Sequence, residues 1–152
     1  MLQNSTAGLL RQIGSALPGD GGNPPEEISE LSFAQVCLLG ELFEQEKAGR
    51  EPLSLSALSQ ETGFSKATVC ATLKKLRKAG YVRVRMNSRD NRRKEIILTR
   101  QAWTVASSIT QYVFALDCKL CAGISANDVQ IMKQSLLAIL QNAKGSAHKV
   151  LE

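Results

Sequence analysis

The sequence of 152 residues predicts a mostly α-helical fold with one small β-hairpin. Apolar residues recur at helical spacing over most of the chain, and this spacing changes to strict alternation only between residues 82 and 98. Glycines and capping Ser or Thr residues separate the successive segments. Hydrophobic residues make up 43% of the chain and charged residues 22%, so wholesale disorder is excluded.

Composition also sets the expected compartment. The sequence contains no apolar run long enough to cross a membrane, and residues 1–17 lack the basic start of a secretory signal. Four cysteines are too few for a disulfide scaffold in a chain of this length, so we expect a reducing cytoplasm.

The first two predicted helices are separated by a loop. An amphipathic helix is expected over residues 5–16, and the Pro- and Gly-rich residues 18–25 break it. Ser32 and Gln35 have capping-box spacing and open a second helix, which Gly49 ends. Its predicted apolar face consists of Val36, Leu39, Leu42 and Phe43.

Two further helices are joined by a short turn. Ser54 can cap the first, and Gly63 is suited to a left-handed stop at its end. Ser65 can cap the second, which Gly80 ends. The second helix has a buried stripe of Val69, Leu73 and Leu76.

A hairpin and two long helices complete the chain. Val82, Val84 and Met86 alternate with Arg83 and Arg85, which predicts a half-buried strand with a cationic outer face. Residues 87–94 form a polar turn and the strand returns through Ile96 and Leu98. We then expect a helix from Thr99 to about Ala122, a stop at Gly123, and a last helix opened by Ser125 and Asp128.

Positive charge is concentrated in one segment. Residues 66–100 contain 12 of the 19 Lys and Arg residues but only two acids, Asp90 and Glu95. This segment therefore carries a charge of +10, and the remainder of the chain carries −5. Such a basic block favours a polyanionic partner, although a solvated charged helix face is the simpler reading of a charge run.

The order helix, short turn, helix and basic hairpin is a helix-turn-helix followed by a wing, which predicts binding to duplex DNA. One helix fits the major groove, and small polar or cationic residues at its start can reach bases and phosphates. We assign this role to Ser65, Lys66 and Thr68, and contacts with the backbone or the minor groove to Arg89, Arg92 and Arg93 at the hairpin tip. We expect Lys74, Lys75, Arg83 and Arg85 to neutralise DNA phosphates or to remain solvated at the rim of the interface.

Residues 55–99 resemble the MarR family of bacterial transcriptional regulators. The likeness rests on the helix-turn-helix sequence and on a wing pattern with Asp90, Arg92, Leu98 and Thr99. It implies that Arg92 enters the minor groove and that Asp90 orients a wing arginine. Two departures are Ala102, where the family often has Gly, and Ala71, where relatives often carry a polar or cationic residue.

The resemblance also implies a dimer and a domain layout. Residues 1–30 would form an N-terminal dimerisation helix and loop, residues 31–100 the winged helix-turn-helix, residues 101–145 the C-terminal dimerisation helices, and residues 146–152 a tail. The apolar stripes of the flanking helices exceed what one small core can cover, which independently favours a homodimer on a near-palindromic site. Repression is the more common mode in the family, with release by a small-molecule or oxidant effector.

Several alternatives stay open. Trp103 and Tyr112 are candidate effector contacts, with core packing as the simpler reading. Cys118 and Cys121 form a lone CxxC, which we expect to be buried small hydrophobes, with a thiol sensor as the minority reading. No catalytic motif, metal-ligand pattern or cofactor motif is recognised, so an enzyme is not expected. The alternative function is a winged-helix protein-interaction module without specific DNA binding, and the operator, regulated genes and effector do not follow from the sequence.

Overall fold

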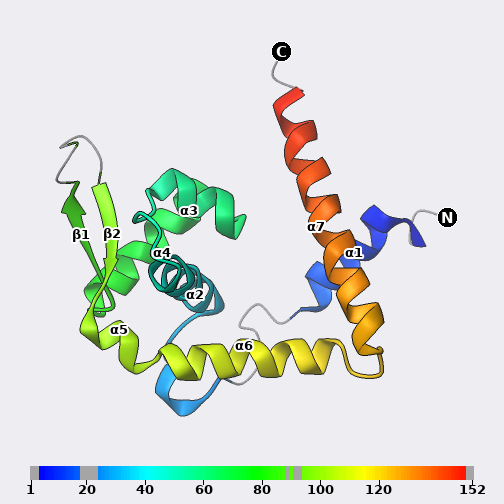
Figure 1. The fold of residues 1–152 in the computed structure, drawn as a ribbon, viewed down its shortest axis with the longest axis horizontal. Coiled ribbons are helices and arrows are strands. Elements are labelled where there is room, and N and C mark those ends of the chain that lie inside the picture. The colour runs from blue at the N-terminus through cyan, green and yellow to red at the C-terminus, as the bar shows by residue number, and fades with distance from the viewer. Residues whose placement is uncertain (1–3, 18–23, 88–89, 91–93, 150–152) are drawn as a thin grey trace. The chain divides into compact units, whose positions relative to one another are not determined.

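The computed structural model describes residues 4–17, 24–87, 90 and 94–149, the last four of them by their backbone alone. The described residues form helices and a single two-stranded antiparallel hairpin, which confirms the predicted class (Figure 1). The elements in chain order are α1 (Thr6–Ala16), the 3-10 helix η2 (Glu26–Ile28), α2 (Phe33–Lys47), α3 (Leu55–Thr62), α4 (Lys66–Lys78), β1 (Val82–Met86), β2 (Lys94–Leu98), α5 (Arg100–Thr104), α6 (Ala106–Leu120) and α7 (Ala126–Lys149).

The chain divides into two compact units, Met1–Leu116 and Asp117–Glu152. The first unit contains the helix-turn-helix and the hairpin, and the second contains the end of α6 and all of α7. The boundaries predicted after residues 30, 100 and 145 stay predictions.

Helix starts follow the capping residues expected from the sequence. The Ser32 hydroxyl accepts from the Gln35 N–H at 3.3 Å, and the Gln35 side chain accepts from the Ser32 N–H at 2.9 Å, which completes the capping box. Ser54 and Ser65 cap α3 and α4 in the same way. The predicted caps are therefore confirmed. Each one satisfies an N–H that the first turn of a helix leaves without a partner.

One hydrophobic core holds the helix-turn-helix together. Helices α2, α3 and α4 pack against one another next to the hairpin (Figure 1). The predicted stripe of α4 is confirmed, since Val69, Leu73 and Leu76 are all buried. Ile28 of η2 is also buried, although the sequence predicts only a loop between the first two helices.

The hairpin departs from the predicted burial. Its register pairs Val82 with Leu98 and Arg85 with Glu95. Of the apolar residues of β1 only Val82 is buried, whereas Val84 and Met86 are 40% and 48% exposed. The expectation of a half-buried strand was wrong for β1 beyond Val82, although Ile96 and Glu95, which pair with Val84 and Arg85, are buried on β2.

The predicted helix from Thr99 to Ala122 is two helices. Val105 ends α5 with φ −104° and ψ 0°, and α6 begins at the next residue. No Gly or Pro marks this break in the sequence.

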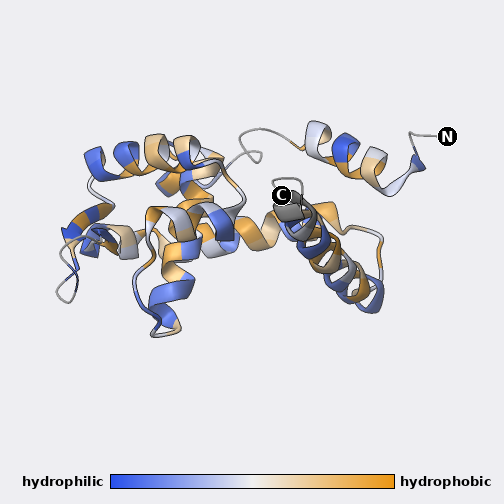
Figure 2. Ribbon diagram, turned by 90° about the horizontal axis from the view of Figure 1, so that it is seen from above, coloured by the Kyte–Doolittle hydropathy of each residue, from blue (hydrophilic) through white to orange (hydrophobic). Residues whose placement is uncertain are grey.

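Exposed apolar side chains recur along α1, α6 and α7, and Figure 2 shows hydrophobic residues along the helices near both ends of the chain. Neither α1 nor α7 contains a buried residue among those described. No helix in the described ranges is long and apolar enough to cross a membrane.

Candidate nucleic-acid interface

The turn between α3 and α4 is built by local hydrogen bonds. Gly63 ends α3 with φ +73°, a left-handed conformation that favours glycine. The Ser59 hydroxyl donates to the Phe64 carbonyl at 2.7 Å, which ties the end of α3 to the turn. The turn is therefore only three residues long, and α4 starts directly after Ser65.

Helix α4 presents a polar surface opposite its buried stripe. Ser65, Lys66 and Thr68, the predicted major-groove residues, are all exposed at its first turn. The Ser65 hydroxyl accepts from the Thr68 N–H at 3.1 Å and lies 2.9 Å from the Thr68 hydroxyl. The two hydroxyls therefore form one small polar cluster at the start of the helix, and the Lys66 ammonium is accessible beside it.

Most cations of residues 66–100 that the structure describes are exposed and form no ion pair. The ion pairs found among the described residues are Glu44–Lys47, Arg85–Glu95 and Asp117–Lys133. The cations of the segment that are exposed without such a pair are Lys66, Lys74, Lys75, Arg77, Lys78, Arg83, Lys94 and Arg100. Their charge is not cancelled within the molecule, which leaves it available to a polyanion.

Arg85 differs from the other predicted phosphate contacts. Its Nε donates to Glu95 Oε2 at 2.9 Å, and the Glu95 carboxylate is buried. Glu95 and Asn87 are functional candidates that the sequence patterns do not predict. The signal that could have found Glu95 is the hairpin register, which places one of the only two acids of this segment opposite an arginine.

The hairpin tip is described only in part. Arg89, Arg92 and Arg93 lie outside the described residues, so their assigned roles stay predictions. Asp90 is exposed, and its backbone N–H donates to Asn87 Oδ1 at 2.9 Å. Between α4 and the hairpin lies a hollow of about 300 Å³ whose lining includes Cys70, Leu73, Lys74 and the exposed Val84.

The candidate effector residues have packing roles in the single chain. Tyr112 is buried in the core. The Trp103 ring lies 4.9 Å from the Phe43 ring, centroid to centroid, and 37% of the residue is exposed. Tyr112 agrees with the simpler reading of core packing, whereas Trp103 is exposed although it packs on Phe43, and effector contact at both residues stays a prediction.

The expectation that the CxxC cysteines are buried was wrong for the chain as described. Cys118 is exposed and Cys121 is partly exposed. Lys133 of α7 forms an ion pair with Asp117, which raises the pKa of Lys133, and Coulomb interactions with Cys121 and Cys118 raise it further. Lys133, Cys118 and Cys121 all belong to the unit 117–152. No group of three or more His, Cys, Asp or Glu in the described residues could hold a metal ion.

Comparison with known proteins supports the family resemblance. The model of the MarR family matches residues 29–93, a range that contains α2, α3, α4 and β1. A search of the curated proteins finds no match to the sequence.

Solved structures of similar fold extend over nearly the whole chain. A MarR protein from Peptoclostridium difficile has a TM-score of 0.80 and 20% identity, covering 99% of this chain and 96% of its own. MepR of S. aureus, solved as a complex with DNA, has a TM-score of 0.74 and 18% identity, covering 94% and 99%. The PcaV transcriptional regulator of Streptomyces coelicolor, solved with its natural ligand, has a TM-score of 0.76 and 16% identity, covering 94% and 96%. At these identities the comparison establishes the fold.

Proposed function

From the MarR-family match of residues 29–93, we propose that the protein is a transcriptional regulator that binds duplex DNA as a homodimer. The observation that carries this proposal is the exposed, cationic outer surface of α4, which sits on a buried stripe and follows a tight turn. A helix of this kind fits the major groove, and the adjacent hairpin reaches the flanking backbone or the minor groove. The solved complex of MepR with DNA supports DNA binding by a protein of this fold.

The residue roles in the proposal follow the surface of α4 and the hairpin. Lys66, Thr68 and Ser65 contact the major groove, and Arg92 with Arg89 and Arg93 serves the wing. Lys74, Lys75 and Arg83 neutralise phosphates, and Asp90 orients a wing arginine. Because Arg85 already pairs with Glu95, we assign it mainly to the hairpin itself.

The homodimer is supported by apolar surface that the single chain leaves uncovered. Helices α1, α6 and α7 expose Leu9, Ile13, Phe114, Ile131, Leu137 and other large hydrophobic residues, and Phe114 is 70% exposed. Burying such surface contributes roughly 25 cal/mol per Å² toward association, against the entropic cost of bringing two chains together. A two-fold dimer would present two α4 helices about 34 Å apart, one turn of DNA, to a near-palindromic site.

Repression with release by an effector completes the proposal. A small molecule at Trp103 and Tyr112 would act by changing the spacing of the two recognition helices, because tight binding needs both helices at once. The structure of PcaV with its natural ligand supports the idea of a ligand for this fold. An oxidant acting on the exposed Cys118 and its neighbour Cys121 is the second effector class in the proposal.

A salt titration of DNA binding tests the proposal directly. For a mixed-sequence duplex, the logarithm of the association constant should fall with the logarithm of salt concentration by about 0.9 per phosphate neutralised. Lys66→Ala and Arg92→Ala should each weaken binding and reduce that slope by about one. Lys119→Ala removes the same charge from α6 and should leave the slope unchanged. No dependence on salt would favour the protein-interaction module, and equal slopes for all three variants would overturn the site assignment.

A further inference from the structure

The hairpin contains one buried acid in the most basic part of the chain. Glu95 of β2 is 7% exposed, although residues 66–100 carry a net charge of +10. Burying a carboxylate is costly unless hydrogen bonds and an opposite charge compensate it. The partners of Glu95 should therefore be specific ones.

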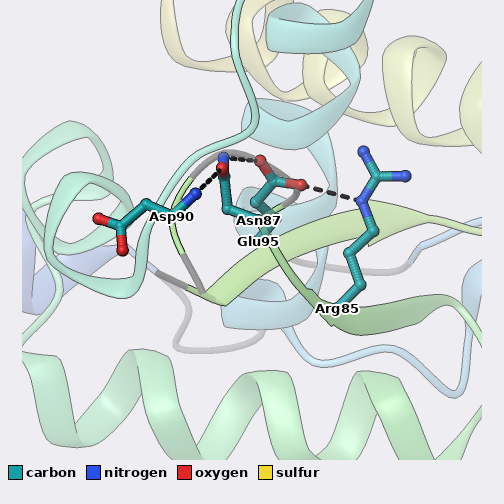
Figure 3. A network of polar contacts seen from close by, with 4 residues as sticks. All are labelled: Arg85, Asn87, Asp90 and Glu95. Atoms are coloured by element: carbon teal, nitrogen blue, oxygen red, sulfur yellow. Dashed lines mark hydrogen bonds and ion pairs between the residues drawn. The ribbon is translucent and has the colours of Figure 1, made fainter. Parts of the chain in front are cut away.

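Both carboxylate oxygens are occupied, and the bonds continue toward the hairpin tip (Figure 3). Oε2 accepts from Arg85 Nε at 2.9 Å across the strand pair. Oε1 accepts from the Asn87 side-chain amide at the end of β1. The oxygen of that same amide accepts from the Asp90 backbone N–H at 2.9 Å.

These bonds link one buried group to the main chain beyond the strand. The Asn87 side-chain amide has only one orientation that satisfies both bonds, because its N–H donates to Glu95 and its oxygen accepts from the Asp90 N–H. A hydrogen bond to a charged acceptor is roughly twice as strong as a neutral one, so Glu95 is the strongest acceptor of the series. The series ends on a backbone atom, which fixes the path of the chain at Asp90 and not merely a side chain.

We propose that Glu95 is a positioning residue for DNA binding: through Asn87 it fixes the backbone at Asp90, and through Arg85 it sets the cationic face of β1. This inference rests on the proposed function, because it requires the hairpin to contact DNA. Glu95 itself does not touch DNA in this account. Its contribution is that the backbone at Asp90 is already fixed before DNA binds, so that ordering this position adds no cost that would weaken affinity.

Net charge alone would predict that losing the Glu95 charge strengthens DNA binding, whereas a positioning role predicts that it weakens binding. Glu95→Gln removes a negative charge from the cationic segment and frees Arg85 from its ion pair. If only net charge mattered, DNA binding would become tighter. If Glu95 positions the hairpin, binding becomes weaker, because the Gln amide can no longer accept from both Arg85 and Asn87. The direction of the change therefore separates the two explanations.

The experiment measures the dissociation constant for a mixed-sequence duplex by fluorescence anisotropy at fixed salt. We expect a roughly tenfold rise for Glu95→Gln, the scale expected when a few ordered groups must be fixed on binding. Asn87→Ser changes no charge and breaks the same series, so it should also raise the dissociation constant. The matched control is Glu51→Gln, which removes an exposed carboxylate that lines the same hollow as Glu95, Asn87 and Asp90. Its binding should be unchanged or tighter.

A second readout follows the hairpin without DNA. Amide hydrogen exchange at Asp90, measured by NMR, should accelerate in Glu95→Gln and in Asn87→Ser but not in Glu51→Gln. Binding by Glu95→Gln that is equal to or tighter than wild type, with folding intact, would overturn the inference, and so would unchanged binding by Asn87→Ser. If the wild-type protein binds no DNA, the proposed function and with it the positioning role fail, whereas the Asp90 exchange still reports whether the network exists.

Discussion

The Thr99 hydroxyl joins three elements, and removing it gives a quantitative test of the fold. It donates to the Gly80 carbonyl at 2.7 Å and accepts from the Ala102 N–H at 3.3 Å, so it both anchors the turn after α4 and caps α5. The Thr99 backbone N–H also donates to the Tyr81 carbonyl at 3.0 Å. Thr99→Val keeps the size and branching of the side chain and removes only the hydroxyl.

The expected cost is the sum of two lost interactions. Losing an N-cap costs about 1 kcal/mol. Losing a hydrogen bond to a half-buried carbonyl costs about 1 kcal/mol more. We therefore expect Thr99→Val to lower the free energy of unfolding by about 2 kcal/mol, which corresponds to a fall in Tm of about 4–8 °C for a chain of this size.

Urea unfolding at one fixed protein concentration is the appropriate assay, because the proposed dimer would make stability depend on concentration. Thr104→Val is the matched control, since its exposed hydroxyl donates only to the Gln101 carbonyl of the same helix, at 2.7 Å. Thr104→Val should change the free energy of unfolding by no more than about 0.5 kcal/mol. If the two variants are equally stable, the reasoning about Thr99 is refuted.

Two other predictions concern glycines and thiols. Gly63→Ala should destabilise by about 1–2 kcal/mol, because φ is +73° although a Cβ would meet no atom within 4 Å. Gly40→Ala inside α2 should instead stabilise the protein by about 0.5–1 kcal/mol, because its backbone is helical and its surroundings are equally open. Urea unfolding measures the change in free energy of unfolding for each glycine variant. If both variants change stability in the same direction, the reasoning is contradicted. Cys70 and Cys118 should react with a thiol reagent before Cys37, because Cys37 is partly buried and burial raises its pKa, which lowers the thiolate fraction at a given pH. Mass spectrometry of partly labelled protein gives the order, and first labelling of Cys37 would contradict it.

Local signals explain why much of the fold could be predicted from the sequence. Ser32, Ser54, Ser65 and Thr99 each bond an N–H within their own first turn, so a few consecutive residues suffice to identify them. Left-handed stops are equally local, as Gly63 shows. The predicted major-groove residues on α4 follow from the same reasoning, because the start of the helix and its buried stripe determine which residues face outward.

The burial or exposure that the sequence did not predict is determined by residues that are distant in sequence but close in space. Alternation at Val84 and Met86 indicates two faces of a strand, but it does not indicate whether another element covers one of them. The burial of Glu95 depends on the strand register and on Asn87, which the alternation pattern does not determine. The exposure of Cys118 depends on tertiary packing, which the CxxC spacing does not determine.

Selection of bound duplexes from a random pool by the purified full chain tests the central claim most directly, namely that two symmetry-related α4 helices bind successive turns of DNA. The account predicts enriched sequences with two inverted half-sites about 10 base pairs apart, centre to centre. It also predicts that Lys66→Ala relaxes the preference at one position of each half-site by about 1–3 kcal/mol, if Lys66 reads a base. A pool that is not enriched over the input, or enriched sequences without dyad symmetry, would contradict the account.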